Sequence, residues 1–158
     1  MKEEVIELDT VDKYNKFFKV ETYHPMVTVV DLSKITQPAQ PFTINYGIYA
    51  LFLKDTLCGD ITYGRQPYDY QEGTIVCFAP GQVASIHAQE GTRPTGYGLL
   101  FHPDFIRGTQ LGHDIRNYSF FSYEAREALH LSEEERHTVI DCLHKIDTEL
   151  RRPADKHS

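Results

Sequence analysis

The chain has 158 residues, of which 41% are hydrophobic and 25% are charged, a composition that fits one folded domain and excludes a disordered chain. Its formal net charge of −7 argues against direct DNA binding, because neutralising phosphates requires a surplus of Lys and Arg. The sequence has no apolar run long enough to span a bilayer, and its acidic start lacks the features of a signal peptide. We therefore expect a cytoplasmic protein with no membrane partner.

The first predicted element is a short helix that lies between residues 8 and 25. Asp9 and Thr10 are suitable N-caps, and Pro25 provides a stop. Apolar residues between these signals recur at helical spacing, so we expect one amphipathic helix. Its apolar face consists of Val11, Tyr14, Phe17 and Phe18.

Residues 26–101 read as an all-β region, because short runs of β-branched and aromatic residues alternate with turn residues. Within 48–54 both alternating sets are apolar, which predicts a strand covered on both faces. Strands at such regular spacing favour a sandwich or barrel, and helices would cover it. The predicted strands lie within 26–32, 43–54, 58–64, 68–70, 74–79, 82–87 and 96–101.

Helical patterns follow Phe101. Ser132 and Glu135 form a capping-box signature at the start of a long helix. Apolar residues then recur along this helix with a/d spacing, and they could pair with a second subunit or pack on the chain's own barrel. We expect a dimer contact, and therefore a folded monomer in the variant Leu143→Glu. The stripe consists of Val139, Leu143, Ile146 and Leu150.

Two histidine-containing groups resemble chemical sites but are interpreted structurally. His102 and Asp104 flank a predicted strand-to-helix corner, with Pro103 in the first helical turn and Gly108 at the helix end. On the last helix a second group lies opposite the apolar stripe, which predicts that it faces solvent. This group consists of His137, Asp141 and His144.

The candidate binding groups lie in the predicted strands. A metal-dependent barrel enzyme would need several clustered His and Glu ligands, but residues 60–73 contain no histidine, so we expect no metal. The sequence has no G-x-S-x-G motif and no cysteine in an activating context, so we also expect no catalytic residues and no cofactor. His87 either faces a ligand or lies at a strand end in water. Tyrosine offers both a flat apolar face and a hydroxyl. We nominate Tyr63, His87 and Tyr97 as ligand-binding residues, and interpret Cys58, Cys77 and Cys142 as reduced and mostly buried.

The order of several segments resembles one bacterial branch of the AraC-type transcriptional regulators. The densest match is GYGLLFHPDFIRGTQLGHDIRNYSFFSYEAREALHLSEEER at 96–136, and TVDKYNKFFKVETYHPMVTVVDLSK at 10–34 and ITYGRQPYDYQEGTIVCFAPGQV at 61–83 extend it upstream. The resemblance implies a cupin-like β-barrel (double-stranded β-helix), with a short N-terminal helix and C-terminal helices. It divides the chain into a helix and barrel at 1–101 and a helical dimerisation segment at 102–158.

The resemblance also implies a function without catalysis. The chain would be the effector-sensing and dimerisation domain of a regulator, binding a small molecule such as a sugar and forming a homodimer through its C-terminal helix. DNA would be read only by a helix-turn-helix domain that follows near residue 158 and is absent from this sequence. The alternative is a small cupin-fold enzyme or isomerase acting on a sugar or small metabolite.

Overall fold

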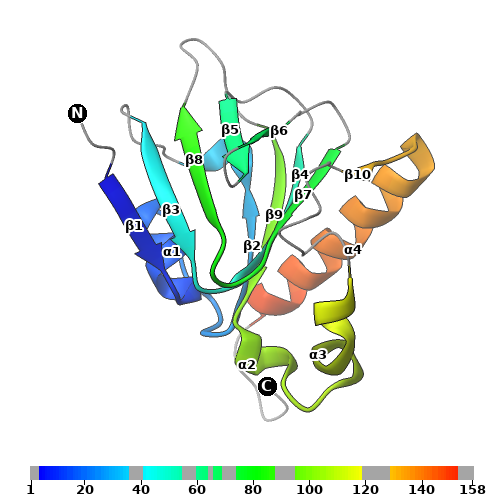
Figure 1. Cartoon of the computed structure of the whole chain (residues 1–158). Helices are drawn as coiled ribbons and strands as arrows, with labels where there is room; N and C mark the ends of the chain where they lie inside the picture. Colours follow the sequence, from blue (N-terminus) through cyan, green and yellow to red (C-terminus); the bar gives the residue numbers. More distant parts are fainter. Residues whose placement is uncertain are drawn as a thin grey trace.

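The computed structural model describes residues 4–35, 41–54, 60–63, 66–68, 74–87, 95–118 and 129–152. These residues form two five-stranded sheets and four α-helices, which confirms the predicted mainly β class with helices (Figure 1). The described strands do not join the two sheets into a closed barrel. The cupin-like barrel therefore stays a prediction.

Each sheet combines strands from distant parts of the sequence, and among the described residues every strand pairing is antiparallel except that of β1 with β3. The first sheet has the order β1 (Glu4–Leu8), β3 (Phe42–Tyr46), β8 (Val83–His87), β5 (Asp60–Tyr63) and β6 (Gln66–Tyr68). The second sheet has the order β10 (Leu129–His130), β7 (Thr74–Phe78), β4 (Tyr49–Lys54), β9 (Gly96–Phe101) and β2 (Val27–Asp31).

The chain passes from the first sheet to the second at Gly47, within the run predicted as a single strand. The Gly47 amide donates to the Leu8 carbonyl over 2.9 Å, which holds this crossing against the end of β1. A Cβ atom at Gly47 would lie 2.5 Å from the Cβ of Asp9, so a larger residue would force the two segments apart. The crossing therefore depends on glycine and divides the run into β3 and β4.

The main core lies between the two sheets and contains side chains from both. The Tyr46 and Phe78 rings stack across it with centroids 4.7 Å apart. The helix α1 (Val11–Phe17) supplies Tyr14 to the same core, where its ring lies 6.5 Å from that of Phe52. Burial raises the pKa values of Tyr14 and Tyr46 above their ordinary range.

The helix α1 begins as predicted but ends earlier. Thr10 is the N-cap, and its side chain accepts from the Lys13 amide over 3.1 Å. After Phe17 the chain turns through Lys19, which has a φ of 60°, and the Val20 amide donates to the Asn15 carbonyl over 2.7 Å. This is the bonding pattern of a Schellman motif, so it ends the helix well before Pro25.

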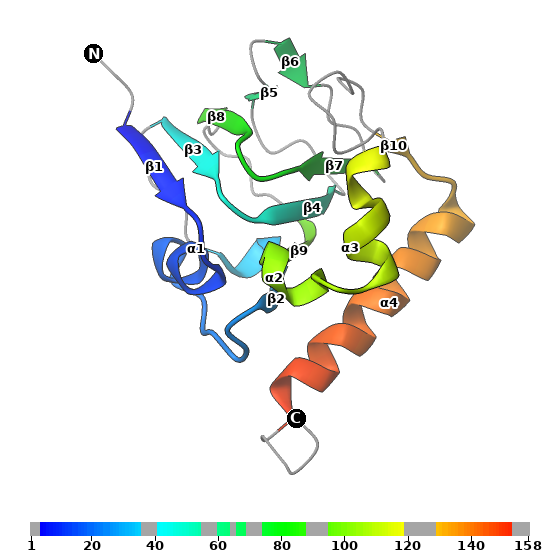
Figure 2. The ribbon, with the colours of Figure 1, turned by 60° about the horizontal axis from the view of Figure 1, so that its bottom comes forward.

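The outer face of the second sheet carries the C-terminal helices α2 (Pro103–Ile106), α3 (Gln110–Asp114) and α4 (Glu133–Arg151) (Figures 1 and 2). Ser132 and Glu135 form the predicted capping box at the start of α4, with bonds of 2.9 and 3.1 Å. The predicted double covering of β4 is confirmed, since Phe52 faces the inter-sheet core and Leu53 faces an outer cluster beside α4.

Within the described residues, no helix has the length and apolar character needed to cross a membrane. The cysteines are only partly as expected: Cys77 is buried, Cys142 is exposed, and Cys58 lies outside the described residues. Burial raises the pKa of the Cys77 thiol to about 12.

Candidate functional site

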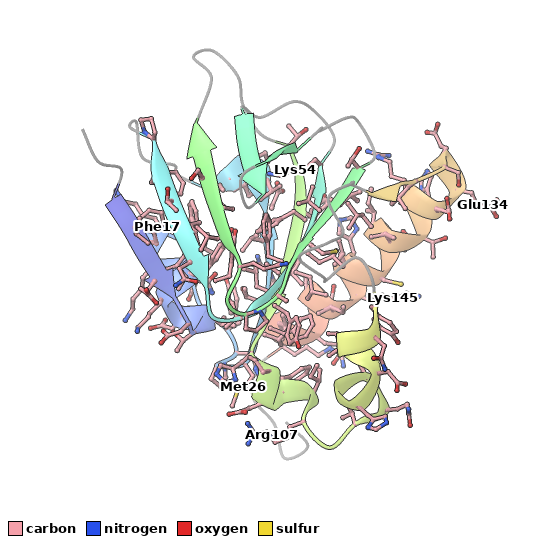
Figure 3. All side chains as sticks on the ribbon, viewed as in Figure 1. Phe17, Met26, Lys54, Arg107, Glu134 and Lys145 are labelled. Atoms are coloured by element: carbon pink, nitrogen blue, oxygen red, sulfur yellow. The ribbon has the colours of Figure 1, made fainter. Side chains whose placement is uncertain are left out.

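The inter-sheet core changes from apolar to polar at the end of β4. Ala50 and Phe52 face this core, and strand alternation places Lys54 on the same face. The Lys54 side chain follows this direction, with its Nζ 5.4 Å from the centre of the Phe52 ring. Only 6% of Lys54 is exposed, and Figure 3 shows it at the upper end of the strand. A buried ammonium group therefore lies where the apolar core ends.

The neighbouring strands bring a hydroxyl group and two glycines to this end. Thr74 is fully buried and pairs with Lys54 from β7, while Gly96 pairs with it from β9. A Cβ atom at Gly98 would lie 2.9 Å from the Phe52 ring, so glycine lets the ring lie against β9. Lys54 and Thr74 also make further interactions within the chain. We call Lys54, Thr74, Gly96 and Gly98 the inner site.

Sequence reasoning did not find Lys54. It is not among the residues nominated from the sequence, although a lysine that continues the core-facing set of a doubly buried strand is an available signal.

Tyr63 and His87 were predicted to bind a ligand, and they lie on paired strands of the first sheet. His87 pairs with Asp60, and Tyr63 pairs with Ala84 three positions away in register. The structure therefore brings their backbones to adjacent strands. Their side chains lie outside the described part of the structure, so their role stays a prediction.

Tyr97 faces away from the inner site. It alternates along β9 with Gly96 and Gly98, and its ring lies on the outer face of the sheet against α4. Its hydroxyl lies 3.2 Å from Nε2 of His144, and the two rings are perpendicular with centroids 5.2 Å apart. The structure thus separates Tyr97 from the inter-sheet space, because strand alternation assigns adjacent residues to opposite faces.

A hollow beside Tyr97 separates α4 from the outer face of β2 and β9. Its volume is about 340 Å³, and its walls combine an apolar floor with charged and aromatic groups. We call it the seam pocket. Its lining residues are Val20, Val29, Val30, Asp31, Lys34, Tyr97, His144, Asp147 and Arg151.

A second hollow, of about 440 Å³, lies between α4 and the short helices α2 and α3. Two of its residues, Phe105 and Leu111, are 49% and 42% exposed. We call this hollow the apolar groove, because almost all of its surface is carbon. Its lining residues are Val27, Leu99, Phe101, Phe105, Ile106, Leu111, Lys145, Ile146, Glu149 and Leu150.

The stripe predicted as a dimer interface contacts the chain's own sheet. Leu143 is only 3% exposed, and Val139 packs on the cluster around Ile75. Leu150 packs on a second cluster, whereas Ile146 lines the apolar groove. Contacts within the chain thus account for the burial of Leu143. The sequence did not reveal these contacts, because helical periodicity does not identify what the helix packs against. Whether the stripe also pairs two subunits stays a prediction.

The corner at His102 has the structure that the sequence predicts. Nδ1 of His102 accepts from the Asp104 amide over 3.0 Å and caps α2, whose first residue is Pro103. Gly108 follows the helix with a φ of 82°. The pair is therefore a helix cap, and Asp104 also makes an ion pair with Arg107.

The other histidine group is exposed on α4, and within it His144 contacts Tyr97. Across the described residues, no group of three or more His, Cys, Asp or Glu side chains is placed to hold a metal ion.

No protein-family model matches the sequence, and no curated protein matches it significantly.

Proposed function

We propose that the chain is the effector-sensing and dimerisation domain of an AraC-type transcriptional regulator and has no catalytic activity. The observation that carries the proposal is the position of Lys54, a charged side chain at the end of an otherwise apolar inter-sheet core. Burying a charge costs free energy unless polar groups compensate it, so a charged side chain at the end of an apolar core is a candidate for a binding role. The sequence resemblance supplies the regulatory class.

The two sheets are, in this proposal, the walls of a cupin-like barrel. Lys54 and Thr74 offer an ammonium group and a hydroxyl to a small polar effector such as a sugar, and Phe52 offers an aromatic face. Tyr63 and His87 belong to the same sheet-lined region through their strands. The effector acts by shifting the balance between two arrangements of the paired domains.

The apolar groove supports the homodimer. Its exposed rim at Phe105 and Leu111 adjoins Ile146 of the predicted stripe. Lys145 and Glu149 lie one helical turn apart at the same groove. Two antiparallel copies of α4 related by a two-fold axis would pair the lysine of each copy with the glutamate of the other. In this proposal the sensing domain itself does not contact DNA, which agrees with its formal net charge of −7.

A ligand titration tests the inner site. We expect at least one sugar from a panel of neutral hexoses and pentoses to raise the stability of the chain, by about 2.7 kcal/mol at 100 times its dissociation constant. Lys54→Met should remove this stabilisation, whereas Lys16→Met, at an exposed lysine of α1, should retain it. Both variants are first checked for cooperative unfolding.

Two results would contradict the proposal. One is a titration in which no sugar stabilises the unmodified chain, or in which sugars stabilise Lys54→Met and Lys16→Met equally. The other is stoichiometric iron, manganese or zinc in the purified chain by elemental analysis, which would favour a metal-dependent cupin enzyme or isomerase.

A further inference from the structure

The seam pocket has the features of a second small-ligand site. Its volume of about 340 Å³ lies at the lower end of the range for small-molecule pockets. It lies on the outer face of β9, because Tyr97 lines it, whereas the inner site lies on the face of Gly96 and Gly98. A ligand in the seam pocket is therefore separate from the effector of the proposed function.

The floor of the seam pocket is apolar. Val29 is buried on the outer face of β2, and Val20 follows the turn that ends α1. Tyr97 and His144 form one wall and are joined by their 3.2 Å contact. A ligand resting on this floor would therefore bury carbon atoms against valine side chains.

Arg151 is held in a fixed orientation beside this floor. Its Nε lies 3.0 Å from both carboxylate oxygens of Asp147, and its Nη1 donates to the Tyr23 hydroxyl over 3.2 Å. Its guanidinium carbon also lies 4.8 Å from the centre of the Tyr23 ring. Among the described residues Nη2 has no hydrogen-bond partner, so this planar cation has donors left for a ligand.

The two carboxylates that line the pocket already accept hydrogen bonds, whereas Lys34 offers a second cation to a ligand. Asp31 accepts from the amide and the hydroxyl of Ser33 over 3.0 and 2.6 Å, and Asp147 accepts from Arg151. Lys34 is exposed at the edge of the pocket and has no ion pair within the described residues. The groups that remain for a ligand are mainly donors, which favours a ligand that accepts hydrogen bonds.

We propose that the seam pocket binds a small organic acid, with its carboxylate at Lys34 and Arg151 and its apolar body on Val20 and Val29. The two cations are balanced by Asp31 and Asp147, so the pocket suits a single negative charge better than the double charge of a phosphate ester. The bound acid bridges β2 and the last turn of α4. It therefore stabilises the docked position of that helix.

An NMR titration of the whole chain tests this site. The probes are sodium benzoate and sodium hexanoate, with benzamide, hexanamide and inorganic phosphate as comparisons. We expect at least one carboxylate to shift the backbone amides of Val29, Asp31 and Arg151 saturably, with a dissociation constant below about 1 mM. The corresponding amide and phosphate should bind at least about tenfold more weakly, since neither carries a single carboxylate charge.

Matched variants locate the carboxylate. Lys34→Met and Arg151→Met should each weaken binding at least about tenfold, a loss typical of a charge-assisted hydrogen bond. Lys16→Met, on α1, and Arg152→Met, at the C-cap of α4, are the controls, because these residues carry the same charges but do not line the pocket. Both controls should bind like the unmodified chain.

Three outcomes would overturn the proposal: no saturation by either carboxylate, equal binding of phosphate or of the neutral amides, and equal loss in the control variants. Shifts confined to Lys54 and Thr74 would also overturn it, because they would assign the acid to the inner site. Failure of the sugar titration leaves these outcomes unchanged, so the two sites are tested separately.

Discussion

The space between the sheets and the seam between the second sheet and α4 are both lined by apolar residues, but they pack differently. The inter-sheet space forms one continuous cluster that includes Tyr46, Phe52 and Phe78. The seam contains two separate clusters, one around Phe101 and one around Leu53, and it holds both the seam pocket and the apolar groove. Continuous packing fixes the fold and gives way to polar groups only at its end near Lys54, whereas interrupted packing along the seam leaves room for further ligands and partners.

The largest expected effect comes from placing a charge at a buried position between α4 and the second sheet. Leu143→Glu should abolish cooperative unfolding or lower the free energy of unfolding by at least about 4 kcal/mol, because a buried unpaired carboxylate is strongly unfavourable. The sequence alone predicted a folded monomer for this variant. Thr148→Glu, at an exposed position of α4, is the control and should unfold normally in urea. A fully stable Leu143→Glu chain would show that α4 is not docked as described.

The next largest effect is the loss of unfolding free energy when a phenylalanine is removed from the inter-sheet core, compared with one removed from the seam. Phe78→Ala removes a ring that is 1% exposed from the continuous core and should cost about 3–5 kcal/mol in urea unfolding. Phe105→Ala removes a ring that is 49% exposed at the apolar groove and should cost less than about 1 kcal/mol. Equal losses would contradict the difference in packing between the two regions.

Alkaline pH should weaken the fold by a smaller amount. The pKa of Cys77 is raised from 9.0 to about 12 in the folded chain, and burial raises those of Tyr14 and Tyr46. These groups favour folding below their unfolded pKa values, and that contribution is lost as the pH rises toward their folded values. We expect the free energy of unfolding to fall by about 2 kcal/mol between pH 8 and pH 10.

A variant separates the thiol from the tyrosines in that pH dependence. Cys77→Ala should reduce the fall by about 1 kcal/mol, because its contribution begins near the ordinary thiol pKa of 9.0. Cys142→Ala, at an exposed cysteine, should leave it unchanged. A fall that is identical in both variants would show that Cys77 does not contribute.

The smallest effect on stability is expected at the rim of the groove. Leu111→Glu should change the free energy of unfolding by less than about 0.5 kcal/mol, because the side chain is 42% exposed. It should nevertheless convert the proposed dimer to a monomer, as measured by light scattering. Val5→Glu changes another exposed apolar residue, on β1, and should leave the mass unchanged. A dimer that persists in Leu111→Glu would remove the groove from the interface.

Local patterns predicted most of the elements but few of their partners. The Thr10 cap, the Ser132 capping box and the His102 corner were all readable, because caps depend on adjacent residues. The strand β1 was missed, since its parallel pairing with β3 depends on residues far along the chain. The end of α1 was misplaced because the turn at Lys19 uses a residue that seldom adopts a positive φ.

The candidate sites were less predictable for the same reason. The run around Tyr97 does not reveal which face of β9 is buried, because its neighbours are glycines rather than large apolar residues. The stripe on α4 predicted a contact surface but not whether the contact lies within the chain. Lys54 and the seam pocket depend on groups from several elements, and their position became clear only when the sheets and α4 were placed together.

A repressor fusion tests directly whether this chain pairs the subunits of a regulator. The chain replaces the dimerisation domain of a repressor whose DNA-binding domain represses a reporter only as a dimer. We predict that the fusion restores repression and that the Leu111→Glu fusion, at the same cellular level, loses it. A fusion that is folded and present at that level, yet represses no better than the DNA-binding domain alone, would show that the chain does not pair subunits.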